Sequence, residues 1–119
     1  MKCNCTEYNC PVGATIDLIG GKYKALILWH LLDKTLRFGE LRKLIPQATP
    51  KMLTQQLREL EEANLVIRTV YPVVPPKVEY TLSDFGTSIK PILVAMYTWG
   101  SDYMINNGKE INCSMQPFS

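Results

Sequence analysis

Polar side chains between positions 51 and 58 combine the chemical groups that read DNA bases. At the spacing i, i+3, i+4, i+7 stand Lys51, Thr54, Gln55 and Arg58. In a helix this spacing places all four on one face. In the major groove a glutamine pairs with adenine and an arginine with guanine, each through two hydrogen bonds, while a lysine attracts phosphate. A helix that presents this row to solvent is therefore a candidate for sequence-specific DNA binding, although a solvated face of an ordinary helix has the same pattern.

The cysteines are the other residues with reactive chemistry. Three of the four fall within the first ten residues, and Cys113 is near the other end of the chain. Cys10 precedes Pro11 and a short helical pattern, so we expect its sulfur near a helix N-terminus. There, unpaired N–H groups and the helix dipole favour an accessible thiolate, which reacts with oxidants and electrophiles. A redox-sensing role and a structural or incidental role are both open for Cys10.

A metal site would require Cys3, Cys5 and Cys10 together, with Cys113 as a further ligand. Their CxCx4C spacing differs from the paired CxxC of a structural zinc site, although flexible thiolates could hold a soft metal. A disulfide staple is the weakest alternative, because a domain of this size folds without one and cytoplasmic thiols stay reduced. The single histidine, His30, lies beside Trp29 in a buried-looking helix, and we interpret both as structural.

The composition of the 119-residue chain suits one ordinary domain. It is 46% hydrophobic and 20% charged, with a formal net charge of +2. No apolar run reaches the roughly eighteen residues of a membrane span, and the start lacks a signal-peptide pattern. We therefore expect a cytoplasmic protein with no membrane partner. The chain also lacks a Cys/His pair and a cofactor-binding glycine loop, so we expect no cofactor and no enzymatic activity.

Caps and hydrophobic periodicity define the elements that would position the polar row. Thr49 is a good N-cap and Pro50 suits the first helical position, so a helix is predicted over 50–63. Its core stripe is Leu53, Leu57 and Leu60. A short helix before it makes 37–63 a helix-turn-helix, preceded by N-terminal helices over 11–33.

Two alternating segments, VIRTVY and KVEYTL, flank the proline-rich PVVPP. They predict a β-hairpin over 65–82. Ser83 then caps one continuous helix over 84–107, about 35 Å long. Its apolar residues cover too much of the circumference for one packing face, so we expect a second copy of the chain to cover part of it. The expected interface residues are Ile92, Met96, Trp99 and Tyr103.

This order of elements predicts a mainly α fold with a small β-hairpin (α+β). It is a winged helix-turn-helix with a long C-terminal dimerisation helix, forming one domain over 1–119. The wing adds Arg68 and Lys77 beside the proline loop, where a cation could meet the neighbouring minor groove or the DNA backbone. The full set of expected DNA-binding residues is Lys51, Thr54, Gln55, Arg58, Thr49, Arg37, Arg68 and Lys77.

The chain resembles the HxlR-type transcriptional regulators, which are winged-helix proteins related to the MarR group. The likeness rests on CPVGATIDLIGGKY, on the run from RFGELRKL to VEYTLSDFG, and on YTWG. It implies a homodimer on a pseudo-palindromic operator in double-stranded DNA, with the helix at 50–63 in the major groove and the hairpin at 66–82 as the wing. Several members sense electrophiles or oxidants through a cysteine at the position matching Cys10.

Some residues depart from the family pattern. Gly13 stands where the family usually has an acidic residue, and Tyr23 where tryptophan is common, but neither lies on the expected reading face. Cys3, Cys5 and Cys113 also fall outside the shared pattern.

The leading hypothesis is a dimeric, sequence-specific DNA-binding transcriptional regulator, with thiol oxidation or electrophile modification at Cys10 as its candidate switch. No motif identifies the inducer. A repressor is favoured over an activator, because occluding a promoter needs no polymerase contact. The alternatives are a ligand- or metal-responsive regulator without a redox role, and a winged-helix module for protein or RNA contacts. A small thiol oxidoreductase has the least support.

Overall fold

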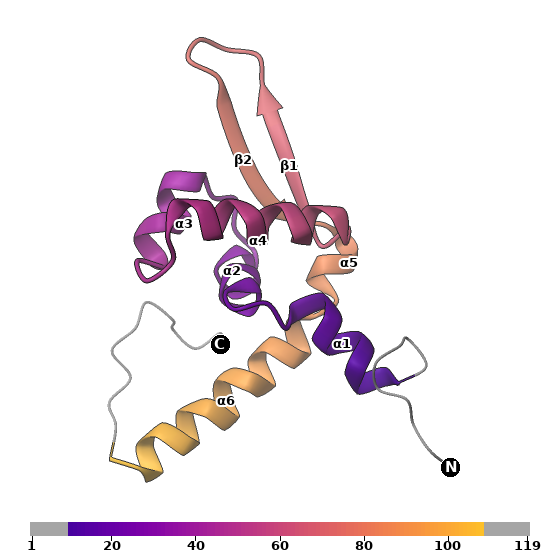
Figure 1. Ribbon diagram of the computed structural model, residues 1–119, viewed down its shortest axis with the longest axis vertical. Helices are drawn as coiled ribbons and strands as arrows, with labels where there is room; N and C mark the ends of the chain where they lie inside the picture. Colours follow the sequence, from indigo (N-terminus) through magenta and orange to yellow (C-terminus); the bar gives the residue numbers. More distant parts are fainter. Residues whose placement is uncertain (1–9, 109–119) are drawn as a thin grey trace.

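The computed structural model describes residues 10–108 and shows a helical body from which a two-stranded hairpin projects (Figure 1). The strands are antiparallel, with Val66 opposite Leu82 and Tyr71 opposite Lys77. The predicted fold, a winged helix-turn-helix with a long C-terminal helix, is confirmed. In chain order the elements are α1 (Pro11–Ile19), α2 (Lys24–Leu31), α3 (Phe38–Leu44), α4 (Pro50–Glu62), β1 (Val66–Tyr71), β2 (Lys77–Leu82), α5 (Asp84–Thr87) and α6 (Lys90–Asn106).

Helix α2 lies in the centre of the body and contacts α3, α4, β2 and α6. Its residues Ile27, Leu28 and Leu31 have almost no exposed surface. Trp29 and His30 are also buried, as expected of structural residues. Burial, together with the nearby positive charge of Lys34, lowers the pKa of His30, because a buried imidazole is easier to keep neutral than charged.

Helix α4 begins and ends where the sequence predicts. The Thr49 hydroxyl oxygen accepts a hydrogen bond from the Met52 amide at 3.1 Å, and Pro50 occupies the first turn. After the helix, Asn64 has a φ of 63°. This left-handed conformation is one that asparagine tolerates better than most residues, and it turns the chain from α4 into β1.

The hairpin is tied to the helical body through the segment between α2 and α3. Leu36 and Tyr80 form a β-bridge, in which the Leu36 amide donates to the Tyr80 carbonyl at 3.0 Å and the Tyr80 amide donates back at 2.8 Å. Both side chains are buried. The base of the wing is therefore fixed relative to the start of α3.

The prediction of one continuous helix over 84–107 is wrong. The chain makes a single turn as α5, continues through Ser88 and Ile89 with i→i+3 hydrogen bonds, and resumes as α6. Pro91 lies in the first turn of α6. Because proline has no N–H and disfavours helical geometry in the residue before it, an uninterrupted helix cannot pass through this position unperturbed. Within 10–108, no helix has the length and apolar character that crossing a membrane requires.

Candidate nucleic-acid interface

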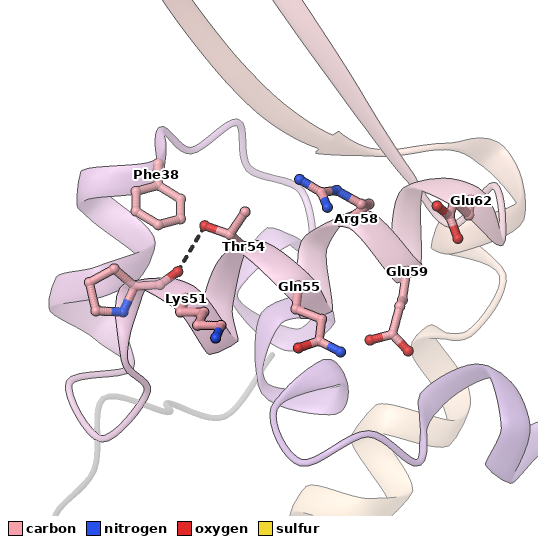
Figure 2. Close-up of a pocket in the computed structure, with 8 residues that line it drawn as sticks. Phe38, Lys51, Thr54, Gln55, Arg58, Glu59 and Glu62 are labelled. Carbon is pink, nitrogen blue, oxygen red and sulfur yellow. Dashed lines mark hydrogen bonds between the residues drawn. The ribbon is translucent and has the colours of Figure 1, made fainter.

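The outer face of α4 carries the polar row that the sequence singled out. Leu53, Leu57 and Leu60 are buried against the body, while Lys51, Thr54, Gln55 and Arg58 are exposed. Figure 2 shows these side chains projecting from successive turns of the helix. The leucine stripe therefore sets the rotation of α4 and, with it, the direction in which the row points.

The four residues, which we call the reading row, line one shallow groove of about 640 Å³. Phe38 from the start of α3 lies near the Thr54 end of the groove (Figure 2). Phe38 is half-buried and packs against the edge of the core. Its ring provides an apolar wall beside the row, and its position depends on how α3 packs across α4.

Thr54 has less donor capacity than its residue type suggests. Its hydroxyl donates to the Pro50 carbonyl at 2.8 Å, one turn earlier in the helix (Figure 2). The hydroxyl hydrogen is therefore occupied, which leaves the oxygen as an acceptor and the methyl group as an apolar contact. Such a side chain suits an amino group or a thymine methyl on a base edge better than a phosphate.

Acidic side chains also reach the groove, close to the reading row. Glu59 and Glu62 line it together with Arg58. The carboxylate of Glu59 is paired: Lys24 Nζ lies 3.4 Å from Oε1, and Gln56 Nε2 donates to Oε2 at 3.5 Å. The charge facing a polyanion from this position is therefore partly compensated.

The sequence did not predict a network that we call the α2–α4 clamp. It consists of Gln56, Glu59, Lys24 and the Tyr23 amide. Gln56 Oε1 accepts a hydrogen bond from the Tyr23 amide at 3.2 Å, so the clamp joins the start of α2 to the middle of α4. Lys24 is 8% exposed, a degree of burial that a lysine tolerates only when it is paired. The i, i+3 spacing of Gln56 and Glu59 indicates that these two side chains can meet. It does not indicate their partners Tyr23 and Lys24, which come from another helix.

The two wing cations lie on opposite faces of the hairpin. Arg68 is opposite Tyr80, and Lys77 is opposite Tyr71. Residues directly opposite in an antiparallel pair project to the same face, and successive residues alternate. Arg68 is thus on the face of the buried Tyr80, whereas Lys77 is on the other face, where its Nζ is 3.4 Å from Glu79 and 5.2 Å from the centre of the Tyr71 ring.

The two remaining predicted contacts lie at helix starts. Arg37 is the N-cap of α3; it is exposed, and its amide donates to the Glu40 carboxylate at 2.9 Å. Thr49 is exposed at the N-cap of α4, with its hydroxyl oxygen engaged in capping. Neither residue lines the groove of the reading row.

Cys10 is the N-cap of α1, as its place before Pro11 predicted, and its carbonyl accepts the Ala14 amide at 2.8 Å. The expectation of an accessible thiol is wrong, because Cys10 is 4% exposed. The place of Cys10 before Pro11 predicts that it is an N-cap, but it does not predict whether other residues cover its side chain. The other cysteines of the metal and disulfide hypotheses, Cys3, Cys5 and Cys113, lie outside the described residues.

Helix α6 presents two different faces. On the inner face Leu93 is buried, and the Tyr97 ring stacks on Trp29 with centroids 5.1 Å apart. On the outer face four large side chains at i, i+4, i+7 and i+11, which we call the α6 stripe, are 40–73% exposed: Ile92, Met96, Trp99 and Tyr103. This spacing places the stripe on one side of the helix.

Comparison with known proteins agrees with this architecture. A model of the HxlR-like helix-turn-helix family matches residues 18–108. The HTH-type transcriptional regulator YdeP of Bacillus subtilis (strain 168) is 52% identical over 94 residues, which are 79% of this chain and 73% of that protein. A helix-turn-helix regulator of Methanothermobacter thermautotrophicus is 50% identical over 97 residues, covering 82% of this chain and 74% of the relative.

Solved structures extend the similarity to the backbone. The redox regulator HypR in its reduced form superposes with a TM-score of 0.78 at 46% identity, over 83% of this chain and 99% of that one. The reduced regulator YodB of B. subtilis gives a TM-score of 0.69 at 33% identity, over 87% and 95% of the two chains. The chain therefore belongs to the HxlR-like helix-turn-helix family of DNA-binding transcriptional regulators.

Proposed function

We propose that the protein is a homodimeric repressor that reads a pseudo-palindromic operator in double-stranded DNA with the outer face of α4. The observation that carries the proposal is the reading row, which is exposed, lies opposite a fully buried leucine stripe and lines a groove. In this role Arg58 contacts guanine, Gln55 contacts adenine and Lys51 contacts phosphate. Arg37, Arg68 and Lys77 bind the backbone, and Thr49 holds the start of the reading helix.

The second copy covers the α6 stripe. Trp99 and Tyr103 are 73% and 51% exposed, and their rings stack with centroids 5.8 Å apart. Val12 and Ile16 on α1 are also exposed, at 68% and 58%. Apolar side chains of this size, gathered at one spacing, are typical of an interface with another protein surface. Dimerisation would set two copies of α4 on half-sites about 34–36 Å apart.

Repression fits this surface better than activation does, because a dimer seated on a promoter blocks it without a further contact. This role places the protein in the same compartment as the chromosome, which for a bacterial or archaeal regulator is the cytoplasm.

Thiol chemistry at Cys10 is the proposed switch. Support comes from HypR, which is described as a redox regulator with oxidized and reduced structures. Because Cys10 is buried at the N-cap of α1, a reagent would reach its sulfur only after a local opening, which we place at the first turn of α1. Diamide would take two electrons and two protons from Cys10 and a second thiol, and the S–S bond that forms between them would hold that turn open and displace α1. The α2–α4 clamp begins a few residues after α1, so the displacement would be transmitted to the reading helix through Gln56 and Glu59.

The test is fluorescence anisotropy on DNA from upstream of the protein's own gene, with reduced and diamide-treated protein. We expect tight binding when reduced and weaker binding after diamide, with the diamide effect lost in Cys10→Ser. Tight binding that diamide leaves unchanged would remove the thiol switch and keep the regulator. It would favour a ligand- or metal-responsive regulator, whereas failure to bind any duplex would favour the protein or RNA module.

A further inference from the structure

The tip of the wing is apolar, in contrast to the reading row. It consists of Pro72, Val73, Val74, Pro75 and Pro76, without a charged or hydrogen-bonding side chain. Val74 is 100% exposed and Val73 is 51% exposed. A fully exposed aliphatic side chain at the end of a projecting hairpin gains nothing from the fold, so its effect on stability is small. The tip therefore has surface available for a partner.

The nearby cations do not convert this tip into an ordinary charged wing. Lys77 is held by the Glu79 carboxylate and the Tyr71 ring on one face of the hairpin. Glu79 also accepts a hydrogen bond from Tyr71 and raises the pKa of that phenol. Arg68 lies on the other face, three residues before the end of β1, or about 10 Å from it. At the tip itself, Val74 is the side chain most available to contact a partner, because it is fully exposed.

The hairpin is long enough and sufficiently fixed to deliver this side chain to DNA. Strands of six residues span about 20 Å. Neighbouring grooves lie about 17 Å apart along the duplex, half of the 34–36 Å turn. The Leu36–Tyr80 bridge anchors the base, the Val73 amide donates to the Tyr71 carbonyl at 2.8 Å, and each proline fixes its own φ. With α4 in the major groove, the tip reaches the adjacent minor groove.

We propose that Val74 is an apolar wedge that enters the minor groove and partly unstacks one base step. Apolar side chains in the minor groove act in this way, because they cannot pair with base edges but can fill the gap between opened base pairs. The step that opens most readily is pyrimidine–purine, such as TA or CA. The wing would thus select sequence by deformability while α4 selects it by hydrogen bonds. This proposal rests on the proposed DNA-binding function.

The experiment uses the full chain and a duplex selected for tight binding from a random library. In one set of duplexes, 2-aminopurine replaces single adenines on either side of each half-site, and its fluorescence rises when the base unstacks. In a second set, dyes on the two ends report bending. We expect wild type to brighten the probe at one step in the minor groove beside each half-site, and to kink the duplex by about 20–90°.

Val74→Ala and Val74→Thr are the test variants, and Val70→Ala is the matched control. Val70 is a half-exposed valine that is paired with Val78 on the strands, two residues before the tip begins. The Val74 variants should lose the fluorescence rise and most of the bend, and should bind roughly tenfold more weakly, because methyl groups that would be buried are removed or replaced. The affinity of the control should stay within about twofold of wild type, because the methyl groups that it removes would not be buried against DNA.

Three results would overturn the wedge. They are a probe that stays dark at every position, Val74 variants that match wild type, or a Val70→Ala loss as large as that of Val74→Ala. If the duplex is bound tightly in any of these cases, the DNA-binding function stands and only the wedge fails. The tip would then be assigned to a protein contact. Absence of binding to every duplex would instead defeat the proposed function itself.

Discussion

Helices α4 and α6 each have one buried face and one exposed face, yet the exposed faces have opposite chemistry. On α4 the exposed residues include Lys51, Gln55 and Arg58. On α6 they are large apolar side chains, with Trp99 73% exposed. Both helices pack on the same core through aliphatic and aromatic residues, so burial of the inner faces does not explain the difference.

The contrast indicates two kinds of partner. A cationic and amide-bearing surface exchanges water and counterions for phosphates and base edges, and its affinity depends on salt. An apolar surface is stabilised when water is excluded, so its affinity follows the buried area and shape. The wing combines features of both classes, because its cations are on the strands and its tip is apolar. One small domain thus has a polar, cationic exposed face on α4 and an apolar exposed face on α6.

The largest expected effect comes from placing a charge in the α6 stripe. Met96→Lys should convert the dimer into monomers, because an unpaired ammonium buried in an apolar interface costs several kcal/mol. Light scattering measures the change in mass. Thr98→Lys, on another side of α6, is the matched control and should remain dimeric. A Met96→Lys protein that is still a dimer would place the interface away from the stripe.

Next in size is the loss of a base contact from the reading row. Arg58→Ala should weaken binding to the selected duplex by about 1–3 kcal/mol and relax selectivity at one base pair, because a bidentate pair with guanine is lost. Competition binding with single-base variants measures both effects. Lys34→Ala removes one charge in the α2–α3 turn and should leave selectivity unchanged. An equal loss on every duplex would reduce Arg58 to a phosphate contact.

The α2–α4 clamp can be tested through a glycine. A Cβ at Gly21 would clash with Gln56 Oε1 and would lie 2.9 Å from the Lys24 side chain. Because both neighbours are ends of flexible side chains, Gly21→Ala should lower the free energy of unfolding by only about 1 kcal/mol.

The matched control for this substitution is Gly39→Ala in α3, where nothing lies within 4 Å of the added methyl group. It should raise stability by up to about 1 kcal/mol, since alanine is the better helix former. Urea unfolding measures both variants. A Gly21→Ala protein that is as stable as wild type, or more stable, would show that the clamp does not restrain α4.

The smallest effect is expected at the wing cation that is already paired. Lys77→Ala should weaken binding to all duplexes alike, by under about 1 kcal/mol, since the ammonium gives up Glu79 when it meets a phosphate. Anisotropy on the operator and on a scrambled duplex measures this change. A loss confined to the operator would contradict a backbone contact.

The sequence predicted those features that depend on local periodicity and caps. The leucine stripe, the Thr49 cap and Pro50 determine α4, and the row of four polar residues follows from them. The features it did not predict depend on packing between distant segments. The burial of Cys10, the partners of Glu59 and the position of Phe38 beside the reading row are of this kind. The break before α6 is different, because Pro91 in the sequence indicates a helix start at this position. The long apolar pattern favoured one continuous helix instead.

The most direct test of the account is the salt dependence of duplex binding by wild type and Lys51→Ala. For the wild type, the logarithm of the association constant should fall linearly with the logarithm of salt concentration, with a slope near −0.9 for each phosphate contacted. The slope for Lys51→Ala should be shallower by about 0.9 for each protomer. A flat response for the wild type, or identical slopes for the two proteins, would contradict the assignment of the α4 outer face to DNA.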